Sequence, residues 1–164
     1  MSTATLHLRD AAATDAAGAR LAPELCGGMV VSLSGDLGAG KTTLVRGCLR
    51  ALGWPGAVKS PSYTLVELYP LSSLYFYHFD FYRFADPSEW ETAGLADYFR
   101  EDAVCMIEWP ERVGGMLPPA DLLLNLLYPD GTSASGRQLA LAAQSQGGER
   151  CLTAMAAVGA GRKV

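Results

Sequence analysis

The segment MVVSLSGDLGAGKTTLVRGCLRAL, residues 29–52, joins a β-branched apolar run to a glycine-rich turn and then to a helical repeat. Residues 29–35 have the pattern of a buried strand. From Thr42 to Leu52 the apolar residues recur at helical spacing, and Gly53 with Pro55 ends the repeat. A strand, a glycine turn and a helix in this order predict an α/β fold built around residues 35–43.

The turn itself, GDLGAGKTT, fits the G-x-x-x-x-G-K-[ST] pattern of a phosphate-binding loop through Gly35, Gly40, Lys41 and Thr42. Glycines let the main chain wrap closely around a polyphosphate, so that N–H groups and the helix N-terminus point at negative oxygens. Lys41 is then expected to reach the β- and γ-phosphates, and Thr42 to bind Mg²⁺. The alternative is a glycine-rich turn with a solvated lysine, but the flanking strand and helix favour the phosphate-binding loop. Without the N-K-x-D element of guanine-specific proteins, ATP is favoured.

The length and the net charge of the chain limit how many domains it can form and which partners it can bind. The 164 residues suffice for one domain, and the net charge of -4 argues against a surface that grips nucleic acid directly. We expect a cytoplasmic protein, because neither a secretory signal nor a membrane-length apolar run is seen. The four cysteines are too scattered to suggest a zinc site or a disulfide framework, and small core residues are expected at Cys26, Cys48, Cys105 and Cys151.

A second group of polar residues lies in FYHFDFYR, residues 76–83. In a strand, His78, Asp80 and Tyr82 share one side, opposite a row of aromatic residues. Because an unpaired buried carboxylate is costly, the polar side is expected to face a metal, a substrate or water. The alternative is a half-exposed strand whose polar side is simply wet.

Two further segments fit the binding of Mg²⁺ and a nucleoside triphosphate. Glu108 ends the apolar run AVCMIE, at the sheet edge where ligands of α/β proteins gather, and is placed like an acid that holds Mg²⁺. The loop KSPSYT, residues 59–64, supplies hydroxyl groups where nucleotide switches sense the γ-phosphate. A plain Ser-Pro turn is the alternative for that loop.

The remaining pattern predicts the rest of the fold. Further strands are expected at 5–8, 64–69, 74–83, 103–109, 121–129 and 137–144, the last two joined by the turn DGTSASG, and helices at 11–25 and 86–99. We therefore predict one P-loop NTPase-like α/β domain over residues 1–164, with a central mixed sheet, added antiparallel strands and flanking helices. Frayed ends are expected at 1–4 and about 155–164.

The segments GDLGAGKTTLVRG, VKSPSYTLVELY, YHFDFYR and EWPER, in this order and spacing, resemble the TsaE family, formerly YjeE, over roughly residues 5–150. The resemblance implies a Mg²⁺-dependent ATPase, an accessory subunit for threonylcarbamoylation of adenosine 37 in tRNA. It implies docking on the TsaD–TsaB heterodimer, only indirect contact with tRNA, and no membrane.

The resemblance also implies roles for individual residues. Asp80 and Lys41 are the expected catalytic residues, with Asp80 orienting or activating water, and Thr42 and Glu108 are the expected Mg²⁺ ligands. The expected nucleotide-binding residues are Gly35, Asp36, Leu37, Gly38, Ala39, Gly40, Lys41, Thr42, Thr43, Ser60, Thr64 and Trp109.

Two other functions fit the phosphate-binding loop. One is a small-molecule P-loop kinase, which needs an acceptor pocket and an arginine-bearing lid; no lid-like insertion is evident. The other is a nucleotide-gated binding module in which the acids only position Mg²⁺. No arginine of the loop is an obvious arginine finger. We therefore expect slow hydrolysis by the isolated chain and completion of the site by the partner complex.

Overall fold

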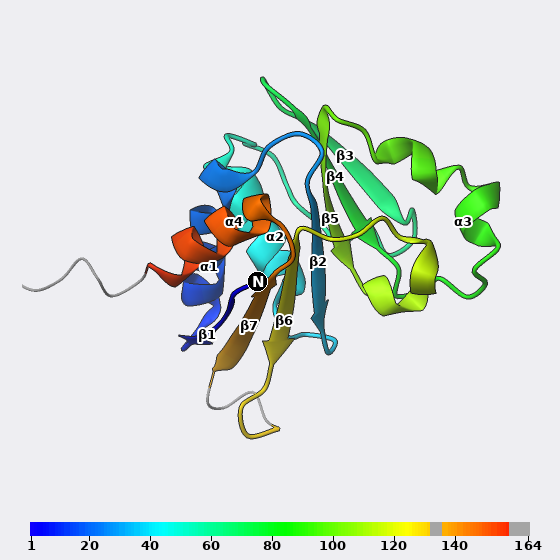
Figure 1. Cartoon of the computed structure of the whole chain (residues 1–164). Coiled ribbons are helices and arrows are strands. Elements are labelled where there is room, and N and C mark those ends of the chain that lie inside the picture. The colour runs from blue at the N-terminus through cyan, green and yellow to red at the C-terminus, as the bar shows by residue number, and fades with distance from the viewer. Residues whose placement is uncertain (132–135, 158–164) are drawn as a thin grey trace, which may run out of the picture.

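Seven strands form one mixed sheet in the computed structural model, which describes residues 1–131 and 136–157 (Figure 1). The strand order is β1-β7-β6-β2-β5-β4-β3. The strands are β1 (Thr3–Leu8), β2 (Val30–Gly35), β3 (Val66–Pro70), β4 (Tyr75–Asp80), β5 (Ala103–Glu108), β6 (Leu122–Leu127) and β7 (Arg137–Ala143). The helices are α1 (Ala11–Leu21), α2 (Lys41–Ala51), α3 (Glu89–Thr92) and α4 (Gln146–Ala156), with 3-10 turns η1 (Ala22–Glu24), η2 (Leu95–Tyr98), η3 (Pro110–Arg112) and η4 (Gly114–Met116).

The centre of the sheet is parallel and its margins are antiparallel. β2 pairs in parallel with β5 and β6, and β4 pairs in parallel with β5. β3, β7 and β1 are added antiparallel strands. The predicted α/β class, with a mixed sheet and antiparallel additions, is confirmed. The turn DGTSASG includes residues 132–135, which lie outside the described residues.

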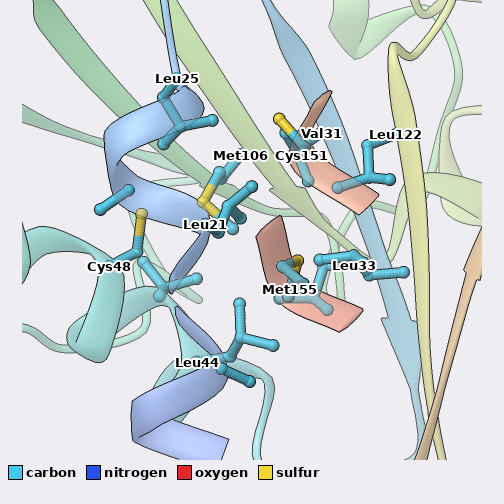
Figure 2. Packing of buried hydrophobic residues seen from close by; sticks show 14 of the residues in the cluster. Leu21, Leu25, Val31, Leu33, Leu44, Cys48, Met106, Leu122, Cys151 and Met155 are labelled. Atoms are coloured by element: carbon cyan, nitrogen blue, oxygen red, sulfur yellow. The ribbon is translucent and has the colours of Figure 1, made fainter. Parts of the chain in front are cut away.

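Helices α1, α2 and α4 cover one face of the sheet, where most of the core lies (Figure 1). Figure 2 shows Leu21 and Leu44, from two of these helices, facing Val31 and Leu33 of β2 and Met106 of β5. Burying each such side chain contributes about 1.5–3 kcal/mol. This packing fixes α2, and with it the phosphate-binding loop, against the central strand.

The opposite face carries a smaller aromatic core beneath α3 and η2. Phe79 stacks on Phe81 and on Phe99, with ring centroids 5.6 and 5.4 Å apart. Trp90 of α3 is also buried, and its ring centroid lies 5.6 Å from that of Phe99. The segment between β4 and β5 is therefore packed down on the sheet.

Helices α1 and α2 touch through their main chains at two glycines. A Cβ at Gly18 of α1 would collide with the carbonyl oxygen of Leu44 and lie 2.9 Å from the nitrogen of Cys48. A Cβ at Gly47 of α2 would collide with the carbonyl oxygen of Asp15. Real Cβ atoms cannot approach main-chain atoms so closely, so this helix contact requires both glycines.

Several expected boundaries differ from the structure. The strand expected over 74–83 ends at Asp80, and Phe84 donates a main-chain hydrogen bond to Phe81 in the turn that follows. The helix expected over 86–99 is divided into α3 and η2 because Gly94 has a φ of 65°. The helix expected over 11–25 ends at Leu21 and continues as η1.

The described residues near both ends of the chain belong to regular elements where fraying was expected. β1 begins at Thr3, inside the stretch 1–4 that was expected to fray. Helix α4 was not predicted, and its Met155 is fully buried although fraying was expected from about 155. Residues 158–164 lie outside the described residues. Of the cysteines, three are buried as expected, whereas Cys26 is exposed.

No helix of the described ranges is both long and apolar enough to cross a membrane.

We expect Gly18→Ala to destabilise the chain by about 1–3 kcal/mol, because overpacking at the α1–α2 contact outweighs the gain of at most about 1 kcal/mol in helix propensity. Urea unfolding followed by circular dichroism measures the change. Gly115→Ala is the matched control, because a Cβ there meets nothing within 4 Å. Equal stability of the two variants would contradict the close helix contact.

Candidate functional site

The phosphate-binding loop connects the end of β2 to the start of α2. Gly38 and Gly40 have φ angles of 76° and 108°, which side-chain-bearing residues rarely adopt. Gly40 is the N-cap residue, and no side chain within residues 1–131 and 136–157 caps the helix. The first-turn N–H groups of α2 therefore have no side-chain acceptor and, with the positive end of the helix dipole, suit an anion.

Lys41, the first residue of α2, is buried, with 5% of its surface exposed. Its ammonium group donates to the carbonyl oxygens of Gly35 and Asp36, the latter at 2.9 Å, and lies 4.4 Å from the centroid of the Trp109 ring. Burial lowers the pKa of Lys41, while nearby carboxylates, that of Glu108 foremost, oppose this shift. The loop thus folds around its own cation.

Trp109 reaches this position because its backbone is left-handed, with a φ of 58°. Such a conformation costs about 1–3 kcal/mol in a residue other than glycine and is concentrated at functional sites. Pro110 follows and starts η3, which ends the strand. The strained residue places an indole ring directly beside the Lys41 ammonium.

Glu108 ends β5 and is almost fully buried, at 3% exposure. Its carboxylate accepts from the Thr42 hydroxyl, with oxygen separations of 3.2 and 3.4 Å, and lies 2.5 Å from Nε2 of His78. His78 is completely buried, and its Nδ1 has no hydrogen-bond partner in the described part of the chain. The two predicted Mg²⁺ ligands, Thr42 and Glu108, therefore lie together.

Asp80 ends β4 directly opposite Glu108 in the parallel pairing. One carboxylate oxygen accepts from the Ser60 hydroxyl, and the other accepts from the main-chain N–H of Tyr82 at 2.9 Å. Asp80 is 4% exposed and His78 is not exposed at all, so the alternative of a wet polar side is wrong. Both acids stand at the carboxyl ends of adjacent strands, beside the loop.

A cavity of about 440 Å³ brings these groups together. It is lined by Leu37, Gly38, Gly40, Lys41, Thr42, Thr43, Ser60, Ser62, Asp80, Tyr82, Arg83, Glu108 and Trp109. Among the expected nucleotide-binding residues, Gly35 and Asp36 contribute the carbonyl groups that hold Lys41, and do not line it. Ala39 faces a neighbouring cavity. The hydroxyl of Thr64 donates to the carbonyl of Val66 at 3.3 Å, away from the loop.

Ser62, Tyr82 and Arg83 line the cavity but were not among the individual residues expected to bind nucleotide. Ser62 lies in the loop 59–64 that was expected to sense the γ-phosphate, whereas Arg83 had no expected role. Tyr82 shares the polar side expected for His78 and Asp80, and this periodicity was a usable signal. Arg83 lies in the turn after β4, where strand alternation no longer applies.

A second cavity of about 280 Å³ lies on the other side of the loop, toward β1 and α1. Gly38, Gly40 and Thr43 line both cavities. Arg137 of β7 donates from Nε to the carbonyl oxygen of Ala39 at 3.0 Å and supports the loop from this side. The loop therefore lies between two neighbouring cavities at the start of α2.

Comparison with known proteins assigns the family. The profile of the family described as "Threonylcarbamoyl adenosine biosynthesis protein TsaE" matches residues 8–161. A tRNA threonylcarbamoyladenosine biosynthesis protein TsaE from Haemophilus influenzae is 50% identical over 126 residues, covering 77% of each chain. The counterpart from Synechocystis is 42% identical over 110 residues, covering 65% of this chain and 69% of the relative.

A solved structure agrees with the sequence matches. The crystal structure of YdiB from Bacillus subtilis superposes with a TM-score of 0.76, covers 94% of both chains and is 27% identical. The shared architecture is the P-loop fold. This chain belongs to the TsaE family of threonylcarbamoyladenosine biosynthesis proteins.

Proposed function

We propose that this chain binds and hydrolyses ATP with Mg²⁺, as an accessory subunit that acts on the TsaD–TsaB complex during threonylcarbamoylation of adenosine 37 in tRNA. The observation that supports this proposal is a single cavity at the N-terminus of α2, which is lined by Lys41, Thr42, Asp80 and Glu108. The relatives are named for this tRNA modification, so the cytoplasm is the proposed location.

The oxygen groups at the site fit Mg²⁺. Thr42 and Glu108 supply one hydroxyl and one carboxylate. The described residues contain no cluster of three His, Cys, Asp or Glu side chains, so the protein would provide only these few ligands. Mg²⁺ commonly takes one or two protein oxygens and completes its shell with water and substrate phosphate. When bound, the ion neutralises charge that develops on the β- and γ-phosphate oxygens.

Hydrolysis needs a water molecule in line with the bond that breaks. The water oxygen bonds to the γ-phosphorus, the bond from that phosphorus to the β–γ bridging oxygen breaks, and its electron pair leaves with ADP. The water proton is released to phosphate or solvent. Asp80 is fixed by Ser60 and by the Tyr82 N–H, and each carboxylate oxygen keeps a further lone pair to orient water.

The second cavity gives the nucleoside a place. The γ-phosphate belongs near Asp80 and Glu108, so a nucleotide that crosses the loop directs its ribose and base toward Asp10, Thr14 and Arg137. The shared glycines, Gly38 and Gly40, let the phosphates pass close to the main chain.

The packing of α3 favours this function over the small-molecule kinase. A kinase needs a mobile lid and an acceptor pocket. The segment after β4 that carries α3 and η2 is instead anchored by Phe84, Trp90 and Leu95, all buried against the sheet. That segment does not serve as a lid over the phosphates.

The purified chain should release phosphate from ATP slowly, and faster with the TsaD–TsaB pair, because the partner completes or orders the site. Phosphate release is measured for the chain alone and with the pair, in Mg²⁺ and in EDTA. Activity that survives EDTA, or a phosphorylated metabolite formed from a cell extract in place of free phosphate, would contradict the proposal.

Asp80→Asn should reduce partner-dependent ATP turnover by about 10²–10⁴-fold, because the amide replaces one acceptor oxygen with a donor and so cannot hold Ser60, the Tyr82 N–H and the attacking water together. Nucleotide affinity, measured by titration calorimetry, should change by less than about threefold. Asp97→Asn, an exposed change elsewhere, is the control. Unchanged turnover would remove Asp80 from the chemistry and leave a nucleotide-gated binding module.

His78→Gln should raise the Mg²⁺ concentration needed for half-maximal ATP binding by about 10–100-fold, the usual effect of losing a group that orients a metal ligand. Nε2 of His78 is that group, since it lies against the Glu108 carboxylate. A fluorescent ATP analogue titrated with Mg²⁺ gives the readout, and urea unfolding verifies the fold. A variant with normal Mg²⁺ dependence would show that His78 only packs.

A further inference from the structure

Arg83 places a positive charge without an ion-pair partner among the described residues at the 440 Å³ cavity beside the N-terminus of α2. The ion pairs found in residues 1–131 and 136–157 are Arg9–Asp10, His78–Glu108 and Arg100–Asp102, so no carboxylate neutralises Arg83 there. A guanidinium group carries five N–H donors in a planar fork that matches phosphate oxygens. The side chain therefore has both the charge and the geometry for a terminal phosphate.

The backbone that carries Arg83 is firmly held. The N–H of Phe81 donates to the carbonyl of Glu108 at 3.1 Å, and the N–H of Phe84 donates to the carbonyl of Phe81 at 3.0 Å. Both phenylalanine side chains are buried in the aromatic core. The same turn supplies the Tyr82 N–H that fixes Asp80. Arg83 thus projects from a rigid turn that also positions the proposed water-orienting acid.

Arg83 makes one side-chain contact that leaves most of its donors available. Its guanidinium carbon lies 4.3 Å from the centroid of the Tyr63 ring, and Nη2 donates to the Tyr63 hydroxyl at 3.3 Å. Tyr63 is 83% exposed, in the loop whose Ser60 and Ser62 also line the cavity. The stack orients the guanidinium group beside the cavity without neutralising it.

We infer that Arg83 contacts the γ-phosphate of ATP and supplies, from within this chain, a second positive charge in addition to that of Lys41 in the phosphate-binding loop. Charge spreads over the three γ-phosphoryl oxygens as the bond to ADP breaks, so a second cation beside those oxygens stabilises that state. Lys41 is tied to the β2 end of the loop, whereas Arg83 extends from the end of β4. This inference rests on the proposed function.

The test compares Arg83→Ala and Arg83→Lys with wild type, using ADP and the slowly hydrolysed analogue ATPγS as ligands. Arg83→Ala should leave ADP affinity within about twofold, because ADP has no γ-phosphate. Loss of a charge-assisted hydrogen bond should weaken ATPγS by about tenfold or more. Partner-dependent turnover should fall by about 10³-fold, the lower range for an arginine of this kind. Arg83→Lys, which keeps the charge but not the fork, should recover part of both losses.

Arg100→Ala is the matched control. This arginine also lies over a tyrosine ring, 5.2 Å from the Tyr75 centroid, but pairs with Asp102 and does not line the cavity. Arg83→Ala behaving like Arg100→Ala, or weakening ADP and ATPγS equally, would overturn the inference while the proposed function stands. Wild-type chain that binds neither nucleotide would overturn the proposed function and this inference with it.

Discussion

The site depends on burying a cation at the positive end of a helix. Lys41 opens α2 without a side-chain cap nearby, so its charge adds to that of the helix dipole. Carboxylates at the ends of β4 and β5 oppose this charge, and loop carbonyls hold the ammonium group. A bound polyphosphate would bring more negative charge to the Lys41 ammonium group and to the N-terminus of α2 than the loop carbonyl groups do. The parallel pairing of Asp80 with Glu108 brings two carboxylates to one side of the Lys41 ammonium group.

Local patterns were enough to predict the centre of the fold, but not its margins. The apolar run of β2, the glycine turn and the repeat of α2 each indicate the same element order, because local propensity and tertiary packing agree there. Helix α4 escaped prediction because Gly147 and Gly148 in its first turn are poor helix formers. A Cβ at Gly148 would collide with the carbonyl of Asp121, so close packing requires that glycine.

The site shows the same difference between features that local sequence indicates and features that tertiary packing determines. Lys41, Thr42 and Glu108 could be predicted because a fixed motif and the end of a buried strand place them. Arg83 could not, because the direction of its side chain is set by a turn whose geometry depends on Phe81 and Phe84 packing into a distant core. The switch to left-handed backbone at Trp109 likewise has no local glycine to indicate it.

Strand order also determines when the loop can be completed during protein synthesis. β2 lies between β5 and β6, and the N–H of Val30 donates to Asp121, 91 residues further along the chain. A nascent chain that has just released the loop from the ribosome still lacks β5 and β6, the two strands that pair with β2. Until β5 and β6 have been made, both edges of β2 lack their partner strands, and unpaired strand edges of this kind favour aggregation.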